Sequence, residues 1–203
     1  MLETFASEPF VRWLDGVVQD EVTETRWLNL LSQLEYVGCR KILKSIPYER
    51  VNASVLQHIQ EEALHAHLLK QLVLKRGGKD AWEDPSWSES GWEYIQSVDR
   101  QICEGLSPVM YYPLVSWVIE QRVMWLYPWY LEKTSDPAIK RVLTTILAQE
   151  KRHADQFAEH GFNSENQLEA VRIEERAWNK LIVKLSAGDD LFETPYDGYS
   201  ATH

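Results

Sequence analysis

The sequence predicts an all-α protein: a four-helix bundle with one long crossover connection and additional helices at its N- and C-terminal ends. Apolar residues recur at helical spacing, glycine and proline mark only short breaks, and no stretch shows the alternation expected of a strand. The 203 residues suffice for one domain with a sizeable core. We expect this domain over residues 1–186 and an acidic, flexible tail over residues 187–203.

Capping residues and helix breakers set the boundaries of the predicted helices. The Ser-Glu-Pro segment at residues 7–9 predicts the start of a short opening helix. Pro47 and the glycine pair at residues 77–78 are expected to end two of the longer helices. Ser164 with Gln167 is typical of a capping box at the start of the last helix. The longer helices are expected at about residues 22–45, 52–75, 89–103, 107–132, 135–161 and 164–185.

The connection over residues 79–106 is the longest in the chain and carries the helix expected at 89–103. A connection of this length allows the next helix to run parallel to the helix before it. That next helix, at 107–132, is apolar on all sides, as buried helices are. One face meets the bundle, and the other must be covered by the crossover helix or by a second subunit. This apolar outer face leads us to predict a homodimer.

Charge and cysteine content exclude several classes of function. The chain has 21 basic and 31 acidic residues, and its net charge of −10 repels phosphates, so we expect neither nucleic acid nor a membrane surface as a partner. The sequence contains no CxxC motif for a rubredoxin-type or zinc-ribbon site. Cys39 and Cys103 are expected to stay reduced in a cytoplasmic setting. The longest uncharged run, 105–119, is shorter than the roughly 20 residues that span a bilayer.

Four of the predicted helices each carry a glutamate in the middle of an apolar stripe, and two of these glutamates precede a histidine by three residues. In chain order the set is Glu35, Glu62 with His65, Glu120, and Glu150 with His153. A single such pair could form a surface ion pair, but an unpaired carboxylate on an apolar face costs several kcal/mol to bury. Four of them on four long helices require a common partner. We therefore predict two metal ions, for which carboxylates and imidazoles favour iron or manganese.

This ligand order, E, ExxH, E, ExxH on four helices, resembles the ferritin-like superfamily of di-iron carboxylate proteins, and the resemblance covers about residues 22–160. It implies that Glu62 and Glu150 each accompany the histidine of their own helix, that Glu35 and Glu120 complete the shell, and that one glutamate of each set bridges. It also implies two iron ions, with manganese as the alternative, and the activation of dioxygen.

Two functions from different classes follow from this resemblance. The first is an oxidoreductase that uses dioxygen to oxidise or hydroxylate a small organic substrate, with electrons from a separate donor because the sequence has no nucleotide-binding motif. The alternative is a ferroxidase that handles iron, although the additional helices would obstruct a storage cage. The segments at 120–122 and 150–153 are also similar to tRNA-modifying hydroxylases of the superfamily, but the net charge of −10 argues against tRNA.

Small residues suggest a cavity beside the metals. With a single crossover, the positions just above the metals would be Gly38, His58, Ser116 and Ala154. Glycine inside a helix costs about 1 kcal/mol relative to alanine, so Gly38 either allows close helix packing or leaves room for a ligand. His58 could be an extra ligand, or a satisfied or exposed histidine.

Other residues near the predicted ligands also have two interpretations. Tyr127 and Trp117 flank the third glutamate and could form an electron or radical relay, or could simply pack in the core. Cys39 is either a small core residue or a redox partner. Glu61 falls off the apolar stripe of its helix, so we expect it to be exposed.

Overall fold

The computed structural model describes residues 8–82, 85–104, 108–158 and 161–190. Within these residues the fold is all-helical, as predicted, and contains no strand. The helices of this described part are α1 (Glu8–Val17), α2 (Glu21–Ser45), the short 3₁₀ helix η2 (Tyr48–Arg50), α3 (Ala53–Lys75), α4 (Pro85–Cys103), α5 (Pro108–Lys133), α6 (Pro137–Ala158) and α7 (Ser164–Asp190).

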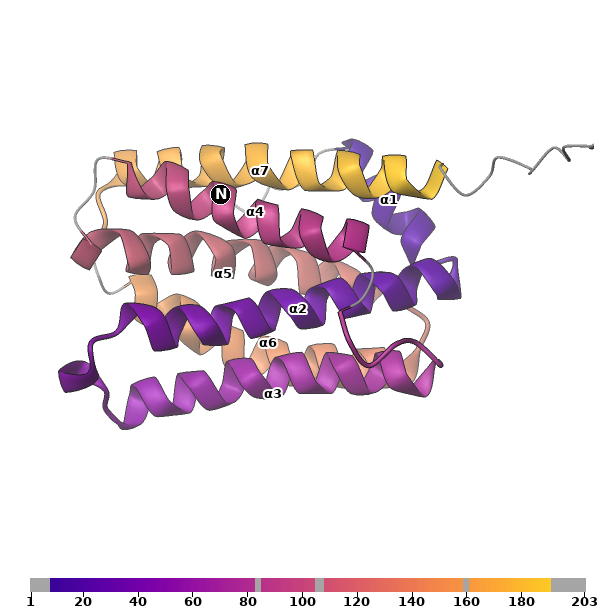
Figure 1. Cartoon of the computed structure of the whole chain (residues 1–203), viewed down its shortest axis with the longest axis horizontal. Helices are drawn as coiled ribbons and strands as arrows, with labels where there is room; N and C mark the ends of the chain where they lie inside the picture. The colour runs from indigo at the N-terminus through magenta and orange to yellow at the C-terminus, as the bar shows by residue number, and fades with distance from the viewer. Residues whose placement is uncertain (1–7, 83–84, 105–107, 159–160, 191–203) are drawn as a thin grey trace, which may run out of the picture.

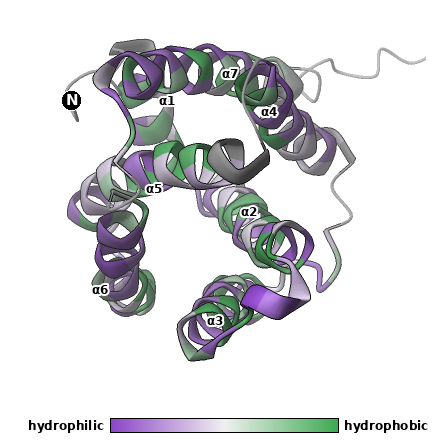
Figure 2. Ribbon diagram, turned by 90° about the vertical axis from the view of Figure 1, so that its left-hand side faces the viewer, coloured by the Kyte–Doolittle hydropathy of each residue, from purple (hydrophilic) through white to green (hydrophobic). Residues whose placement is uncertain are grey.

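The long helices lie in two antiparallel pairs with the crossover helix outside them. α2 packs mainly against α3, and α5 against α6. α4 returns along the length of the molecule before α5 begins, so α3 and α5 run in the same direction (Figure 1). The end-on view shows α2, α3, α5 and α6 on one side, with α4 and α7 packed beyond α5 (Figure 2). α4 begins four residues earlier than predicted, at Pro85.

Asn52 caps α3, the helix expected from about residue 52. Its side-chain oxygen accepts the backbone N–H of Val55 at 3.1 Å, which satisfies one of the amides that a helix start leaves unpaired. The cap predicted at Ser7 lies outside the described residues.

The boundaries of α7 differ from the prediction at both ends. Asn163, not Ser164, caps this helix, because the Asn163 side chain accepts the backbone N–H of Asn166 at 2.7 Å. The helix then continues to Asp190, although the flexible tail was expected to start at residue 187. Residues 191–203 of the predicted tail lie outside the described part.

Both faces of α5 are covered within one chain. Leu114, Val118 and Leu126 are buried, and α5 contacts α4 and α7 as well as α6. The crossover helix and the last helix therefore cover the apolar face from which the homodimer was predicted. The homodimer stays a prediction, and this face no longer argues for it.

A buried ion pair fastens the outer helices to α5. Arg122 of α5 donates to both carboxylate oxygens of Glu174 on α7, from Nε at 2.9 Å and from Nη2 at 2.7 Å. The hydroxyl of Tyr94 on α4 donates to the same carboxylate at 2.7 Å. Burial, followed by the charge of Glu174, raises the pKa of Tyr94 well above its usual value, so the phenol keeps its proton. One carboxylate thus links three helices.

An aromatic cluster holds α1 against the end of the molecule. The ring of Phe10 lies 5.2 Å from Trp125 and 5.5 Å from Trp178, between ring centroids. Trp13 meets Trp27 edge to face at 5.3 Å. Such pairs add about 0.5–1.5 kcal/mol each beyond the area they bury. These rings account for several of the nine tryptophans.

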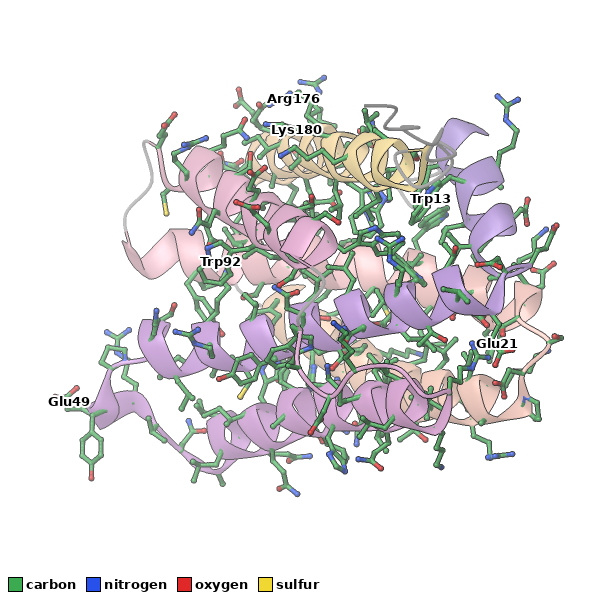
Figure 3. The ribbon with its side chains drawn as sticks, turned by 45° about the vertical axis from the view of Figure 1, so that its right-hand side comes forward. Trp13, Glu21, Glu49, Trp92, Arg176 and Lys180 are labelled. Atoms are coloured by element: carbon green, nitrogen blue, oxygen red, sulfur yellow. The ribbon has the colours of Figure 1, made fainter. Side chains whose placement is uncertain are left out.

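The outer surface of α7 carries exposed charged side chains. Arg176 and Lys180 point away from the helices (Figure 3), and both are exposed. Within the described residues, none of the helices combines the length and the apolar character that a membrane crossing requires.

We predict that Glu174→Ala lowers the free energy of unfolding by about 3–5 kcal/mol, because it leaves the Arg122 charge buried without its carboxylate. Urea denaturation followed by circular dichroism measures the change. Glu169→Ala on the same helix is the control: its contact with Arg172 is 3.7 Å long and exposed, so its effect should stay within about 0.5 kcal/mol. A loss below about 1 kcal/mol for Glu174→Ala would contradict the proposed fastening role.

Candidate metal centre

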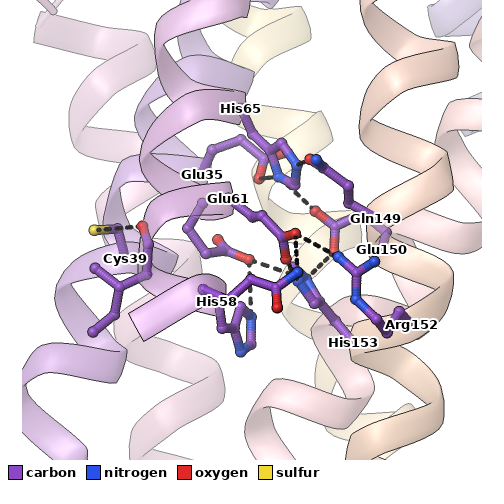
Figure 4. Close-up of polar contacts among 12 residues, drawn as sticks. Glu35, Cys39, His58, Glu61, His65, Gln149, Glu150, Arg152 and His153 are labelled. Carbon is purple, nitrogen blue, oxygen red and sulfur yellow. Dashed lines mark hydrogen bonds and ion pairs between the residues drawn. The ribbon is translucent and has the colours of Figure 1, made fainter. Parts of the chain in front are cut away.

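The glutamates and histidines chosen from the apolar stripes come together between α2, α3, α5 and α6. All of them are buried, and they project toward one another (Figure 4 shows most of them). They are Glu35, Glu62, His65, Glu120, Glu150 and His153.

The ligand atoms form two groups that share one residue. In each group, one nitrogen or carboxylate oxygen from every member lies within 4.8 Å of the others. The first group is Glu35, Glu62, His65 and Glu150, and the second is His58, Glu62, Glu120 and His153. Glu62 belongs to both, which is the position a carboxylate takes when it bridges two metal ions. His58 joins the set although it is not part of either ExxH motif.

Glu150 also reaches both halves of the centre. Its Oε1 lies 2.7 Å from Nδ1 of His65, and its Oε2 lies 2.9 Å from Nδ1 of His153. Each oxygen of this carboxylate therefore faces a different imidazole. Glu62 and Glu150 are thus the two carboxylates placed to contact both halves.

The outer nitrogen of each histidine is held by a neighbour, which turns Nδ1 toward the carboxylates. Nε2 of His65 lies 2.6 Å from the side-chain oxygen of Gln149, and Nε2 of His153 lies 2.8 Å from Glu61. Since both partners accept a hydrogen bond, each imidazole donates its Nε2 proton outward, and its Nδ1 could bind a metal ion after giving up any proton it carries. The apolar stripes did not predict a role for Gln149. In the sequence, only its position next to Glu150 indicates one.

The prediction that Glu61 is exposed is wrong. Its side chain is buried because it reaches from α3 to α6, where it contacts His153 and lies 2.5 Å from Nη2 of Arg152. Burial alone would raise the pKa of Glu61, but hydrogen bonds from His153, Gln57 and Arg152 lower it to about 2. Glu61 is therefore a firmly ionised acceptor that orients the histidine.

The surroundings of Nδ1 of His65 indicate whether a metal ion would fit this centre. This nitrogen is completely buried and, in the described structure, has no hydrogen-bond partner, although Glu150 Oε1 is only 2.7 Å away. A buried nitrogen without a hydrogen bond is costly. A metal ion accepts such a lone pair and at the same time neutralises the surrounding carboxylates. The donor set of carboxylates and imidazoles suits iron or manganese.

The carboxylates strongly perturb one another. Burial, and then repulsion from Glu150, raise the pKa of Glu62 and of Glu120 well above their usual values. Burial also acts to raise the pKa of Glu150, but the contacts with His153 and His65 hold it below its usual value. The pKa of His65 rises to about 11, since its contacts with Glu150 and Glu35 outweigh the effect of burial. Such mutual repulsion favours the binding of cations.

Tyr127 and Cys39 differ in their relation to the centre. The hydroxyl of Tyr127 donates to Glu35, and burial followed by the charge of Glu35 raises the pKa of this phenol well above its usual value. Cys39 instead directs its thiol at the backbone oxygen of Ile59 at 3.7 Å, as a small core residue does. Trp117 is buried and packs against Phe162.

A cavity of about 90 Å³ adjoins the centre. Glu35, Glu62, Glu120 and Glu150 form part of its wall. Three of the four residues predicted for a cavity, Gly38, His58 and Ser116, line it as well; the fourth, Ala154, is buried but is not among its lining residues. The rest of the wall is largely apolar, with contributions from Leu31, Leu34, Ile42, Ile95, Val123 and Phe157.

Gly38 makes room for a ligand residue. A Cβ atom at this position would overlap Oε2 of Glu62. The absence of a side chain on α2 therefore lets the shared carboxylate of α3 occupy the space between the helices. This close approach explains a glycine in mid-helix, where it costs about 1 kcal/mol relative to alanine.

Comparison of the chain with protein-family models, with curated proteins and with solved structures finds no match. What the centre can do chemically follows from its own residues.

We predict that Gly38→Ala weakens metal binding in both halves of the centre, since the added methyl group displaces the carboxylate of Glu62. The helix itself should tolerate alanine, which gains up to about 1 kcal/mol of helix propensity. Anaerobic titration with Fe²⁺, followed by calorimetry, measures the affinity. Gly16→Ala is the matched control, because nothing lies within 4 Å of a Cβ there. Wild-type affinity in Gly38→Ala would show that Glu62 is not held as described.

We also predict that Gln149→Ala and Glu61→Ala each lower metal affinity about 10–100-fold, as the loss of a partner that orients a ligating histidine does. Equilibrium competition with a chromogenic chelator gives the affinities. Gln60→Ala, at an exposed position beside Glu61, should bind metal like the wild type. If both variants match this control, the histidines do not depend on their outer hydrogen bonds.

Proposed function

We propose that this chain is a ferritin-like di-metal oxidoreductase that uses dioxygen to oxidise or hydroxylate a small organic molecule. The observation that carries the proposal is the pair of ligand groups that share Glu62 beside a cavity of about 90 Å³. The helix pairing and the crossover agree with the four-helix bundle expected from the ligand order. We propose two iron ions, with manganese as the alternative.

In this proposal each half of the centre holds one metal ion. Glu35 and His65 would hold one ion, Glu120 and His153 would hold the other, and Glu62 and Glu150 would serve both halves. A bound pair of redox-active ions would supply electrons to dioxygen, and the separate electron donor would return them.

The polar residues around the cavity hold protons in place. The hydroxyl of Tyr127 keeps its proton directed at Glu35. Burial raises the pKa of Tyr112, another cavity residue, well above its usual value, so this phenol is also neutral. Both keep a proton that can be donated to a hydrogen bond at the wall of the cavity.

The cavity favours a small, neutral substrate. Its two cationic side chains are already paired: Arg122 with Glu174, and Lys41 with Asp99. No lysine or arginine of the described wall is therefore left to bind an anionic substrate. A cavity of about 150 Å³ lined by Leu, Ile and Phe binds benzene in an engineered protein. The smaller cavity here, of about 90 Å³, suits a ligand of only a few heavy atoms without movement of its walls.

The remaining partners are proposals as well. Electrons would come from a separate donor, and the assembly would be a homodimer. The alternative function, ferroxidation with iron storage, would require a large cage. On the outer side of α5, where α4 and α7 pack, the described chain is already covered by its own helices. A dimer would favour the oxidoreductase, whereas a cage would favour storage.

The test compares wild-type protein, purified with iron available, with Glu150→Ala. We predict about two irons per chain and a charge-transfer absorption band in the wild type, and the loss of both in the variant, since Glu150 contacts both histidines. Asp155→Ala, at an exposed position on the same helix, is the control and should keep both. Elemental analysis and optical spectroscopy give the result. A wild type that holds no iron under several loading conditions would contradict the proposal.

A further inference from the structure

His58 lies at the edge of the centre, outside the two ExxH motifs. It is on α3, one helical turn before Glu62 and two turns before His65, so it shares their face of the helix. Its side chain is only 11% exposed, and its Nε2 lies 3.2 Å from Oε1 of Glu62 (Figure 4). The ring also lines the cavity.

Two imidazoles meet at the same carboxylate oxygen. The ring of His58 lies against that of His153, with centroids 3.8 Å apart and planes inclined by 34°. Nδ1 of His153 is 3.6 Å from Oε1 of Glu62, the oxygen that His58 also contacts. Two imidazole nitrogens and one carboxylate oxygen thus converge on one small volume.

The same volume is within reach of Glu120. Atoms from His58, Glu62, Glu120 and His153 all lie within 4.8 Å of one another. Ligand atoms on opposite sides of one ion lie about 4.2 Å apart when each metal–ligand distance is about 2.1 Å. A small rotation of side chains therefore suffices to place all four on a single ion.

Resting on the di-metal centre proposed above, we propose that His58 is a seventh ligand, which binds the ion held by Glu120 and His153. The two metal positions are then unequal. One position has a single imidazole, that of His65, and the other has two, those of His58 and His153. Imidazole favours later transition metals more than carboxylate does. The position with His58 is therefore the tighter one for Co²⁺ or Fe²⁺, and it fills first.

A purely structural histidine would behave differently. If His58 only hydrogen-bonds to Glu62, its removal leaves every ligand of both ions in place. If it only moves protons in the cavity, its removal changes turnover but not metal affinity. Only a role as a metal ligand predicts that removal of His58 both lowers metal affinity at one position and changes the ligand-field spectrum of the bound metal.

The experiment is anaerobic titration with Co²⁺, whose visible bands report its coordination, on wild type, His58→Ala, His58→Gln and His67→Ala. His67 is an exposed histidine on the same helix and serves as the matched control. We expect the wild type and the control to bind two ions. Both His58 variants should bind metal normally at the position near His65. At the position near His153 they should lose more affinity than the about 10–100-fold that the loss of an orienting partner costs. Circular dichroism checks that the variants are folded.

Added imidazole provides a second, independent readout. The space vacated in His58→Ala adjoins the cavity, so free imidazole should enter and restore the second ion together with its original visible bands. Equal affinities and spectra in wild type and both His58 variants would overturn the seventh ligand and leave the di-metal centre standing. A wild type that binds neither Co²⁺ nor Fe²⁺ would overturn both.

Discussion

Four glutamate side chains lie together inside a helical protein, and the burial of their charge is the constraint on which the rest of the structure depends. Glu35, Glu62, Glu120 and Glu150 are all less than a tenth exposed. Burial and mutual repulsion push two of them toward the protonated form. A dense positive charge between them would compensate all four groups at once. The helices α2, α3, α5 and α6 therefore hold these side chains where a cation could bind.

Residues around the four glutamates stabilise their buried arrangement. Gln149 and Glu61 accept the outer protons of the two histidines, and Gly38 leaves space for the shared carboxylate of Glu62. On the other side of α5, the buried pair of Arg122 and Glu174 fixes the helices that close the cavity. The candidate metal centre and the helices that cover the cavity thus contact opposite faces of α5. This division explains why α5 is apolar nearly all round and yet carries two buried charges, Glu120 and Arg122.

The sequence predicts local features well because these depend on neighbouring residues. Helical periodicity and caps such as Asn52 determine the helices, and the apolar stripes single out the residues that come together at the centre. Contacts between helices are harder to predict. Glu61 was expected to be exposed, since its own helix cannot reveal that His153 and Arg152 lie opposite. The role of Gly38 likewise depends on a carboxylate from another helix. Asn163 was missed because Ser164 and Gln167 offered an equally good capping pattern.

The central claim is that two metal ions share the carboxylate of Glu62. A crystal structure of iron-loaded protein, with anomalous difference maps at the iron edge, tests it most directly. We expect two peaks about 3.5–4 Å apart, with Glu62 between them, one near His65 and the other near His153. A single peak, or two peaks that do not flank Glu62, would contradict it.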